Sequence, residues 1–292
     1  MSAATQALRI DLHTHSTASD GTEPPADLVV AARAAGLDVV ALTDHDTTAG
    51  WGPAAAALPA GLTLVAGVEL SCVTATAREQ PIPLHVLGYL FDPRHEDFLA
   101  ERRRLRESRV SRARLMVDRL AAAGLPVGWD RVHEQAAGGT VGRPHIGRVL
   151  VEAGVVRSVE EAFSRYLHSG SPYYVAKAET EVTAAVRLIR TAGGVPVFAH
   201  PLARRRGRVV TDEVIAEMAA AGLAGLEVDH PDHDEADRAH LRGLAAELGL
   251  LVTGSSDYHG ANKAIRLGAY RTEPAVYEAL VAQASGAHPI AA

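Results

Sequence analysis

The sequence contains a single cysteine, Cys72, among its 292 residues. One thiol can form neither an internal disulfide nor a thiolate cluster, so any bound metal must take nitrogen and oxygen ligands. No uncharged apolar run approaches the roughly 18 residues that cross a bilayer, and no basic segment followed by an apolar one opens the chain. We therefore expect no membrane association, no secretory signal and a cytoplasmic location.

The sequence has only a small excess of acidic over basic residues. The chain has 29 Lys and Arg against 35 Asp and Glu, a net charge of −6, which argues against a general nucleic-acid coat and against duplex DNA as a partner. Residues 101–120 are an exception, because they hold eight arginines and three acidic residues, a local net charge of +5. These arginines suit RNA, but those at 102, 103, 106 and 109 also fit the solvated face of a helix, which is the interpretation we favour.

Short apolar segments alternate with Ala-rich segments of helical period, a pattern typical of βαβ units and a parallel sheet. The pattern predicts seven buried strands, at residues 8–12, 38–42, 63–68, 84–90, 195–199, 225–229 and 250–254. The helix after the first strand is expected to have Thr22 as its N-cap and to end before Gly36.

Between the fourth and fifth predicted strands the alternation stops. Helical segments are expected there at about 96–123, 129–137, 146–152 and 159–167, the first of them ending at Gly124. This stretch is interpreted as an insertion that forms a lid-like, mostly helical subdomain.

Metal-competent side chains recur at the predicted strands. A lone His-x-His such as His13 and His15 is weak support for a metal site, but the C-terminal ends of parallel barrel strands converge on one rim. His85 lies near the start of its strand, so either that boundary is wrong or its side chain reaches in from the barrel wall. The residues in question are Asp11, His13, His15, Asp44, His45, Asp46, Glu69, His85, His200, His230, Asp257 and His259.

This donor set of imidazoles and carboxylates suits Mn, Zn or Fe and is too rich in nitrogen for a dedicated Mg or Ca site. Several carboxylates among many imidazoles favour more than one ion, because a carboxylate can bridge two cations. Ions held about 3.5–4 Å apart can lower the pKa of bound water, and the resulting hydroxide is the nucleophile we expect.

Eight segments together resemble the polymerase and histidinol phosphatase (PHP) superfamily. Its motifs are matched in order by Asp11–His15, Ser19–Gly21, Leu42–Asp46, Gly67–Glu69, His85, Ala199–Pro201, Glu227–Pro231 and Ser256–Gly260. The resemblance implies an α/β fold, a distorted seven-stranded (β/α)7 barrel, with two or three divalent ions. Residues 1–98 and 178–292 would form the barrel and residues 99–177 the inserted helical lid.

The resemblance also assigns ligands by position. One ion would be held by His13, His15, Glu69 and Asp257; Glu69 would bridge to a second ion bound by His85 and His200; a third would take Asp20, His45 and His259. Asp11 and Asp44 are then expected to orient ligand imidazoles, whereas Asp46 fits that role and a capping role equally well.

Within this superfamily, a barrel with a helical insertion after the fourth strand resembles the small nucleotide phosphoesterases. The resemblance implies hydrolysis of the 3′-phosphate of nucleoside 3′,5′-bisphosphates, with 5′-to-3′ exoribonuclease action on short RNA as the alternative. An amidohydrolase is less favoured, because Glu69 stands where a lysine carbamate would bridge the metals. A non-catalytic module is also less favoured, because each ligand position holds a capable residue.

Roles in catalysis and substrate binding are implied by the same resemblance. The predicted catalytic residues are Glu69, His200, His230 and Asp257. The predicted phosphate-binding residues are Arg143, Lys177, His230 and Arg204. Arg204 is chosen from the loop arginines 204, 205, 206 and 208. Aromatic residues make up 4% of the chain, so base-stacking platforms are scarce and a small nucleotide is favoured over a long strand. No required protein partner is evident.

Overall fold

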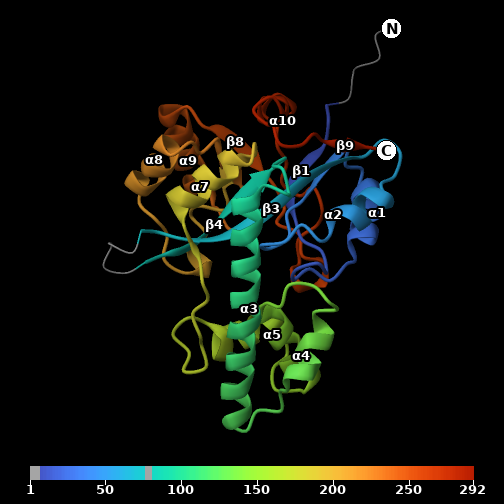
Figure 1. Cartoon of the computed structure of the whole chain (residues 1–292), viewed down its shortest axis with the longest axis vertical. Helices are drawn as coiled ribbons and strands as arrows, with labels where there is room; N and C mark the ends of the chain where they lie inside the picture. The colour runs from blue at the N-terminus through green and yellow to red at the C-terminus, as the bar shows by residue number, and fades with distance from the viewer. Residues whose placement is uncertain (1–6, 76–80) are drawn as a thin grey trace.

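The computed structural model describes residues 7–75 and 81–292, in which seven strands form a nearly closed barrel (Figure 1). The neighbour order is β1-β2-β3-β4-β6-β7-β8, and an isolated bridge between Thr14 and Tyr258 links the first strand to the segment after the last. The strands are β1 (Ile10–Thr14), β2 (Val39–Leu42), β3 (Thr63–Val73), β4 (Pro83–Tyr89), β6 (Val195–Phe198), β7 (Gly225–Asp229) and β8 (Leu251–Gly254). Two short strands, β5 (Thr180–Glu181) and β9 (Ile290–Ala291), pair with β3. A distorted seven-stranded α/β barrel is thus confirmed.

The expectation of a uniformly parallel sheet is wrong at β4, which runs antiparallel to both β3 and β6. Only residues 74–82 connect β3 to β4, and a parallel pair requires a crossover of a dozen residues or more. The reversal also explains His85. Because β4 runs the other way, its start lies at the rim where the other strands end, and His85 is paired in register with Ser71.

Helices cover the barrel on both flanks, α1 and α2 on one side and α7, α8 and α9 on the other (Figure 1). Alternation along β2 shows how the layers form, since Val39 and Ala41 join the core inside the barrel while Val40 and Leu42 join the core beneath α1. The covering helices are α1 (Pro25–Ala34), α2 (Trp51–Ala56), α7 (Val182–Thr191), α8 (Asp212–Ala220), α9 (Glu235–Leu248) and α10 (Pro274–Val281). Thr22 does not cap α1, because its hydroxyl accepts the amide of Ala261 (2.8 Å).

The inserted segment forms a lobe beside the barrel, and the long helix α3 runs through both (Figure 1). Phe98 and Leu105, near the start of α3, pack in the barrel-side core, whereas Met116 and Leu120 pack in a separate core of the lobe. The helices of the lobe are α3 (Glu96–Ala122), α4 (Trp129–Gln135), α5 (Arg143–Glu152) and α6 (Val159–Ala162), which continues as a π-helical turn at Phe163–Leu167. Within the described residues no helix is both long and apolar enough to cross a membrane.

The interpretation of the α3 arginines as a solvated face is wrong for two of the four residues named. Arg102 and Arg109 are buried, and so is Arg112 one turn further on, whereas the apolar Val110 is 39% exposed. Arg102 donates to the carbonyl of Pro93 (2.6 Å) and packs against aromatic rings. The face of α3 that looks toward the barrel is therefore lined with cations as well as apolar groups.

Candidate metal centre

Glu69 lies at the centre of a cluster of histidines at the barrel rim. Its carboxylate lies within 3.3 Å of one ring nitrogen from each of five histidines: His13, His15, His45, His85 and His200. These histidines come from the ends of β1, β2 and β6 and from the start of the reversed strand β4. Burial alone would raise the pKa of Glu69, but the surrounding imidazoles hold it well below its usual range. Glu69 therefore offers a charged carboxylate to whatever the histidines bind.

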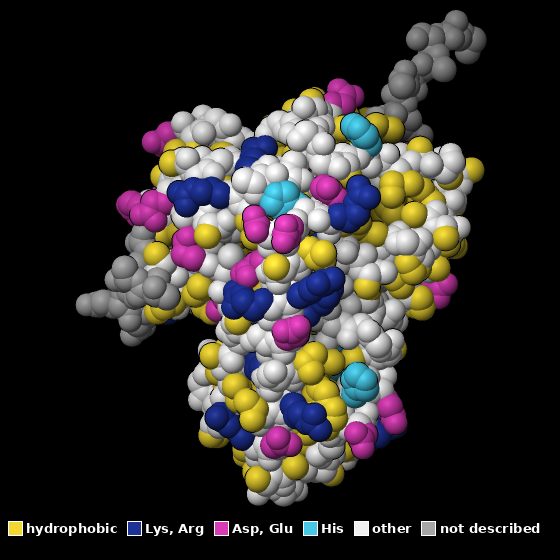
Figure 2. Space-filling model, viewed as in Figure 1, with side chains coloured by type: hydrophobic (Ala, Val, Ile, Leu, Met, Phe, Trp, Pro, Cys, Tyr) yellow, Lys and Arg dark blue, Asp and Glu magenta, His cyan; other side chains and the backbone are white. Residues whose placement is uncertain are grey.

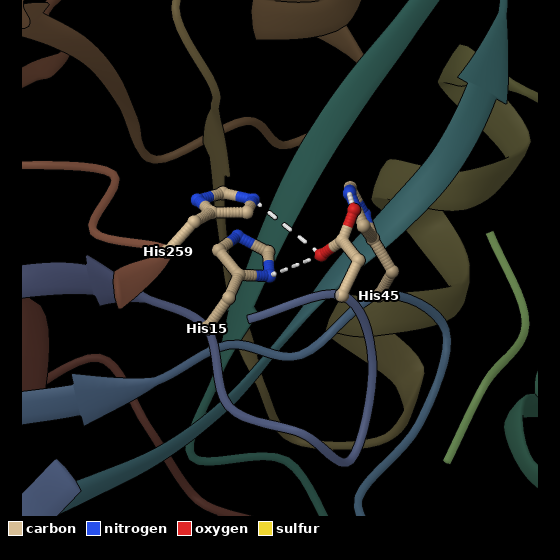
Figure 3. Close-up of side chains that lie close together, drawn as sticks. His15, His45 and His259 are labelled. Carbon is tan, nitrogen blue, oxygen red and sulfur yellow. Dashed lines mark ion pairs between the residues drawn. The ribbon is translucent and has the colours of Figure 1, made fainter. Parts of the chain in front are cut away.

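A second group of donors surrounds Asp20. Figure 3 shows the rings of His15, His45 and His259 turned toward one shared carboxylate, that of Asp20, whose oxygens lie 3.4–3.7 Å from them. His15 and His45 also contact Glu69, so the two carboxylates share ligands.

Asp257 completes the cluster, and its two oxygens face different environments. Oδ1 is buried without a hydrogen-bond partner and lies 3.4–3.5 Å from nitrogens of His13, His15 and His259. Oδ2 instead accepts hydrogen bonds from cationic side chains of two rim loops. All nine residues predicted as ligands are thus brought together at one rim.

The cluster fits divalent cations. Buried ring nitrogens Nδ1 of His45 and His85 lie 3.1 and 2.7 Å from Glu69 oxygens, yet neither makes a hydrogen bond. Burial, then the charge of Arg206, lowers the pKa of His200 to about 3, which leaves its lone pair free for a metal. Three sets of donor atoms lie within 4.8 Å of one another: His15, Asp20, His45 and His259; His13, His15 and Asp257; and His45, Glu69 and His85.

Three of the five non-glycine residues with positive φ in the described part of the chain lie at this rim. His200, Asp46 and Asp257 have φ values of +34°, +57° and +52°, a region that non-glycine residues avoid. Such residues cost on the order of 1–3 kcal/mol each and persist only where the surrounding structure holds them in place. The strain at His200 and Asp257 fixes the direction in which two cluster side chains point.

The expectation that Asp11 and Asp44 orient ligand imidazoles is wrong for Asp11, whereas Asp44 reaches a ring only through a serine. Asp11 accepts the amides of Ser256 (3.0 Å) and Gly268 (2.8 Å), and Asp44 accepts the amide and hydroxyl of Ser16. Both carboxylates therefore hold the rim loops, and Asp44 also accepts the hydroxyl of Ser19 (2.6 Å), which lies 3.4 Å from Nδ1 of His15. Their carboxylates accept hydrogen bonds from backbone amides close to them in space, and sequence spacing does not reveal these contacts.

Glu227 performs the orienting role instead, although the sequence distinguishes it only as the first residue of the motif Glu227–Pro231. Its Oε1 accepts Nδ1–H of His13 (2.8 Å), and its Oε2 accepts the amide of His200 (2.8 Å). Ser255 also donates to this carboxylate. The hydrogen bond places the proton of His13 on Nδ1 and leaves Nε2 as the nitrogen that faces Glu69.

Replacing Glu227 by glutamine should weaken divalent-metal binding by about 10- to 100-fold, because an amide NH₂ would face the backbone N–H of His200 or the ring N–H of His13. The affinity is measured by calorimetric titration of Mn²⁺ into the metal-free protein. The exposed Glu247→Gln variant on α9 is the control and should bind as wild type does. Unchanged affinity in Glu227→Gln would contradict this orienting role.

Two predicted phosphate-binding residues of the insertion lie between the lobe and the barrel. Arg143 starts α5, donates to the carbonyl of Leu167 (2.8 Å) and lies over the ring of Tyr174. Lys177 pairs with Glu179 (2.9 Å).

His230, predicted both as a catalytic and as a phosphate-binding residue, lies beside Asp257. Its Nδ1 accepts the amide of Asp232 (3.0 Å), so its Nε2 carries the proton. That nitrogen lies 3.3 Å from Asp257 Oδ2. The ring therefore presents a hydrogen-bond donor at the edge of the cluster.

Arg204 is not the loop arginine that reaches the cluster. Its guanidinium pairs with Asp237 on α9 at the surface. Arg206 instead donates to Asp257 Oδ2 (2.6 Å) and to Asp232 (2.7 Å). The choice among neighbouring arginines depends on the short 3-10 turn at Arg204–Arg206, which the sequence pattern did not predict.

Comparisons with known proteins agree with this geometry. The sequence model of the PHP domain family matches residues 11–121. The chain is 35% identical to a 5′-3′ exoribonuclease of Haemophilus influenzae, over 86% of this chain and 90% of that protein. It is also 35% identical to a 3′,5′-nucleoside bisphosphate phosphatase of Chromobacterium violaceum, over 86% and 87% of the two chains.

Among solved structures, one from Bifidobacterium adolescentis described as a metal-dependent phosphoesterase is similar to this chain. Its TM-score is 0.87 at 36% identity, and the match covers 94% of this chain and 96% of that one. A match of this extent includes the insertion as well as the barrel. The chain therefore belongs to the PHP family and is a metal-dependent hydrolase of phosphoric esters.

Proposed function

We propose that the enzyme removes the 3′-phosphate of nucleoside 3′,5′-bisphosphates. The observation that carries this proposal is the position of the metal centre between two sets of cationic side chains, one on the barrel loops and one on the insertion. A substrate with two phosphates has an anion for each set. The names of the relatives support a nucleotide substrate, since one is a bisphosphate phosphatase and another an exoribonuclease.

The nine clustered residues are proposed to hold two or three divalent ions of Mn, Zn or Fe. When bound, such ions supply positive charge to the phosphate and activate water at neutral pH. Glu69 is the proposed bridging carboxylate, because its two oxygens face different histidines, His200 and His85 at Oε1 and His15 at Oε2. Asp20 adds a carboxylate to the third proposed site.

The chain's own cations are proposed to orient the phosphate that is attacked. Arg206 and Lys263 converge on Asp257 Oδ2, beside the donors that face the metal sites. The Nε2 proton of His230 lies at the same oxygen and is proposed to stabilise the departing oxygen of the sugar. Arg143 and Lys177 on the insertion remain proposed phosphate ligands.

The division into a barrel (1–98 and 178–292) and a lid (99–177) is likewise a proposal. It is supported by the separate apolar core of the lobe, with Met116 and Leu150 among its members. On the face shown in Figure 2, basic and acidic side chains are interspersed, in keeping with a small ligand rather than duplex DNA. The cytoplasmic location and the lack of a required protein partner stay predictions.

The test compares two substrates with the Mn²⁺-loaded enzyme. Release of inorganic phosphate from adenosine 3′,5′-bisphosphate should exceed release of nucleotides from a short 5′-phosphorylated RNA by at least about tenfold in kcat/KM. The reverse order would support the exoribonuclease alternative. Hydrolysis of a cyclic amide, with neither phosphate ester cleaved, would contradict the proposal and support an amidohydrolase.

A further inference from the structure

The insertion contacts the barrel through the loop between α4 and α5, and we call residues 138–140 of that loop the latch loop. The backbone N–H of Thr140 donates to the carbonyl of Ala18 (2.8 Å). Ala18 belongs to residues 16–21 after β1, which we call the Asp20 loop because they carry that proposed metal ligand. A backbone hydrogen bond thus joins the insertion to a loop of the metal centre.

Gly139 allows the two loops to come this close. A Cβ atom at position 139 would lie 2.1 Å from the carbonyl oxygen of Thr17 and 2.9 Å from that of Ala18. Both oxygens belong to the main chain, so neither can turn aside as the end of a side chain could. Since φ of Gly139 is not positive, the requirement for glycine is one of space rather than of backbone conformation. Any other residue at position 139 therefore pushes the two loops apart.

The barrel and the insertion hold different parts of the Asp20 loop. On the barrel side, Asp44 accepts the amide of Ser16 (2.8 Å) and the hydroxyl of Ser19 (2.6 Å). Asn262 donates to the carbonyl of Asp20 (2.7 Å). The carbonyls of residues 17 and 18 face the latch loop instead. The middle of the Asp20 loop therefore depends on the insertion for its position.

Asp20 itself borders the insertion. A Cβ atom at Gly142, directly before α5, would lie 3.9 Å from Asp20 Cβ. Burial lowers the pKa of Arg148 on α5, and the charge of Asp20 opposes this shift. Asp20 thus lies within reach of the insertion through both its main-chain neighbours and its charge.

A small displacement of Asp20 is enough to remove it from a metal ion. Its carboxylate is the one that the rings of His15, His45 and His259 share in Figure 3. A metal–ligand distance tolerates a change of only about 0.2 Å. Relieving a contact of 2.1 Å at Gly139 to an ordinary one of 3.4 Å moves main-chain atoms much further than that. The fit of the latch loop therefore decides whether Asp20 reaches the ion.

We propose that the latch loop positions Asp20 for the third metal ion, so that the insertion is part of the support of one metal site. This inference rests on the proposed function, which places that ion at Asp20, His45 and His259. Most of the donors around Glu69 lie on strands or close to their ends, so a displaced Asp20 loop leaves them in place. Because coupling is reciprocal, an ion at Asp20 must strengthen the docking of the latch loop by the same factor.

The test measures Mn²⁺ binding to the metal-free protein by calorimetric titration, with elemental analysis after reconstitution. Gly139→Ala should bind one ion per chain about 10- to 100-fold more weakly than wild type, and the other ions should change less than about twofold. Gly128→Ala is the matched control, because a Cβ atom at this exposed glycine of the insertion has no neighbour within 4 Å. Unchanged binding in Gly139→Ala, or equal weakening of every ion, would overturn the inference.

A double variant tests whether Gly139 acts through Asp20. Asp20→Ala removes the carboxylate and should weaken the same ion. Gly139→Ala/Asp20→Ala should then bind Mn²⁺ as Asp20→Ala does, because the latch loop has no ligand left to position. Losses that add in the double variant would show that Gly139 acts by another route, and the positioning role would be rejected.

Hydrogen exchange provides a measurement on the wild type alone. Mass spectrometry of peptides that contain Thr140 should show its amide exchanging at least about tenfold more slowly with Mn²⁺ than without it, the reciprocal of the effect on metal affinity. In Asp20→Ala, Mn²⁺ should not change this exchange. If Mn²⁺ leaves the exchange of the wild type unchanged, the latch loop and the metal site are uncoupled and the inference fails, even where Gly139→Ala does not fold.

Failure of this inference and failure of the proposed function give different results. Metal binding and exchange are measured without substrate, so a latch loop that passes both tests stands even where the bisphosphate is not hydrolysed. If the bisphosphate is hydrolysed and Gly139→Ala binds metal as wild type does, the function stands and the latch loop fails. Wild-type metal content in Asp20→Ala would remove the third ion and this inference together, with hydrolysis left to the ions around Glu69.

Discussion

Glu69→Gln is expected to lower phosphate release by at least about 1,000-fold, with the fold intact. The substitution replaces one carboxylate oxygen by an NH₂ group in a position that several imidazoles share. An amide nitrogen is not a metal ligand, so the variant should also lose at least one ion per chain in elemental analysis after reconstitution. His200, which contacts Glu69 Oε1 at 3.0 Å, should show a comparable loss on substitution by alanine.

The control for this experiment is Glu247→Gln, an exposed carboxylate on α9 that should retain full activity and metal content. Circular dichroism and the thermal midpoint establish that each variant is folded. Turnover within about tenfold of wild type in Glu69→Gln would show that the cluster is not organised around this carboxylate, and the bridging role would then be abandoned.

The loss in Glu69→Gln also distinguishes the three classes of function considered for the sequence. A non-catalytic module would bind metal and show no turnover in the wild type. An amidohydrolase would show turnover of amides that is equally lost. Only a phosphoesterase loses phosphate release and metal together, which is why both are measured on the same preparation.

The strands and the metal-competent residues at their ends could be predicted from the sequence because both depend on local pattern. The residues His13 and His15 lie at the end of a short apolar run, and so does His200, which is enough to place them at a rim. The direction of β4 could not be predicted, because the strands predicted at 63–68 and 84–90 leave 15 residues between them, enough for a parallel crossover, whereas the observed β3 runs on to Val73 and leaves only residues 74–82.

Contacts between distant segments could not be predicted in this way. Glu227 meets His13 across 214 positions of the chain, and its place in a predicted strand and in a motif does not reveal which ring it contacts. The burial of Arg102 and Arg109 contradicts part of the expected solvated face of α3, because arginine normally marks the solvated side of a helix. Partners on the barrel side, Asp46 for Arg109 and the carbonyl of Pro93 for Arg102, make these buried cations tolerable.

The ion pair between Asp46 and Arg109 gives the largest expected effect on stability. Both side chains are buried, and Asp46 also accepts the amide (2.7 Å) and the hydroxyl (2.8 Å) of Ser71. Burial alone would raise the pKa of Asp46, but Arg109 holds it well below its usual range. Because Asp46 directly follows His45, this pair links α3 of the insertion to the loop that carries a proposed metal ligand.

Arg109→Met should lower the free energy of unfolding by about 3–5 kcal/mol, because it leaves Asp46 buried without its cation. The measurement is chemical denaturation followed by circular dichroism. The control is Arg242→Met, which breaks the surface pair with Asp229 and should cost less than about 1 kcal/mol. The double variant Arg109→Met/Asp46→Asn should recover part of the loss, since asparagine needs no cation and can still accept from Ser71.

The double variant decides what the pair contributes. If stability is regained but divalent-metal affinity is not, the charge on Asp46 serves to position His45 and the insertion is coupled to the metal centre. If both are regained, the pair acts only to satisfy two buried charges. Equal stability of wild type and Arg109→Met would mean that Asp46 finds another cation, and Lys177, which already influences the pKa of Asp46, is the residue placed to provide it.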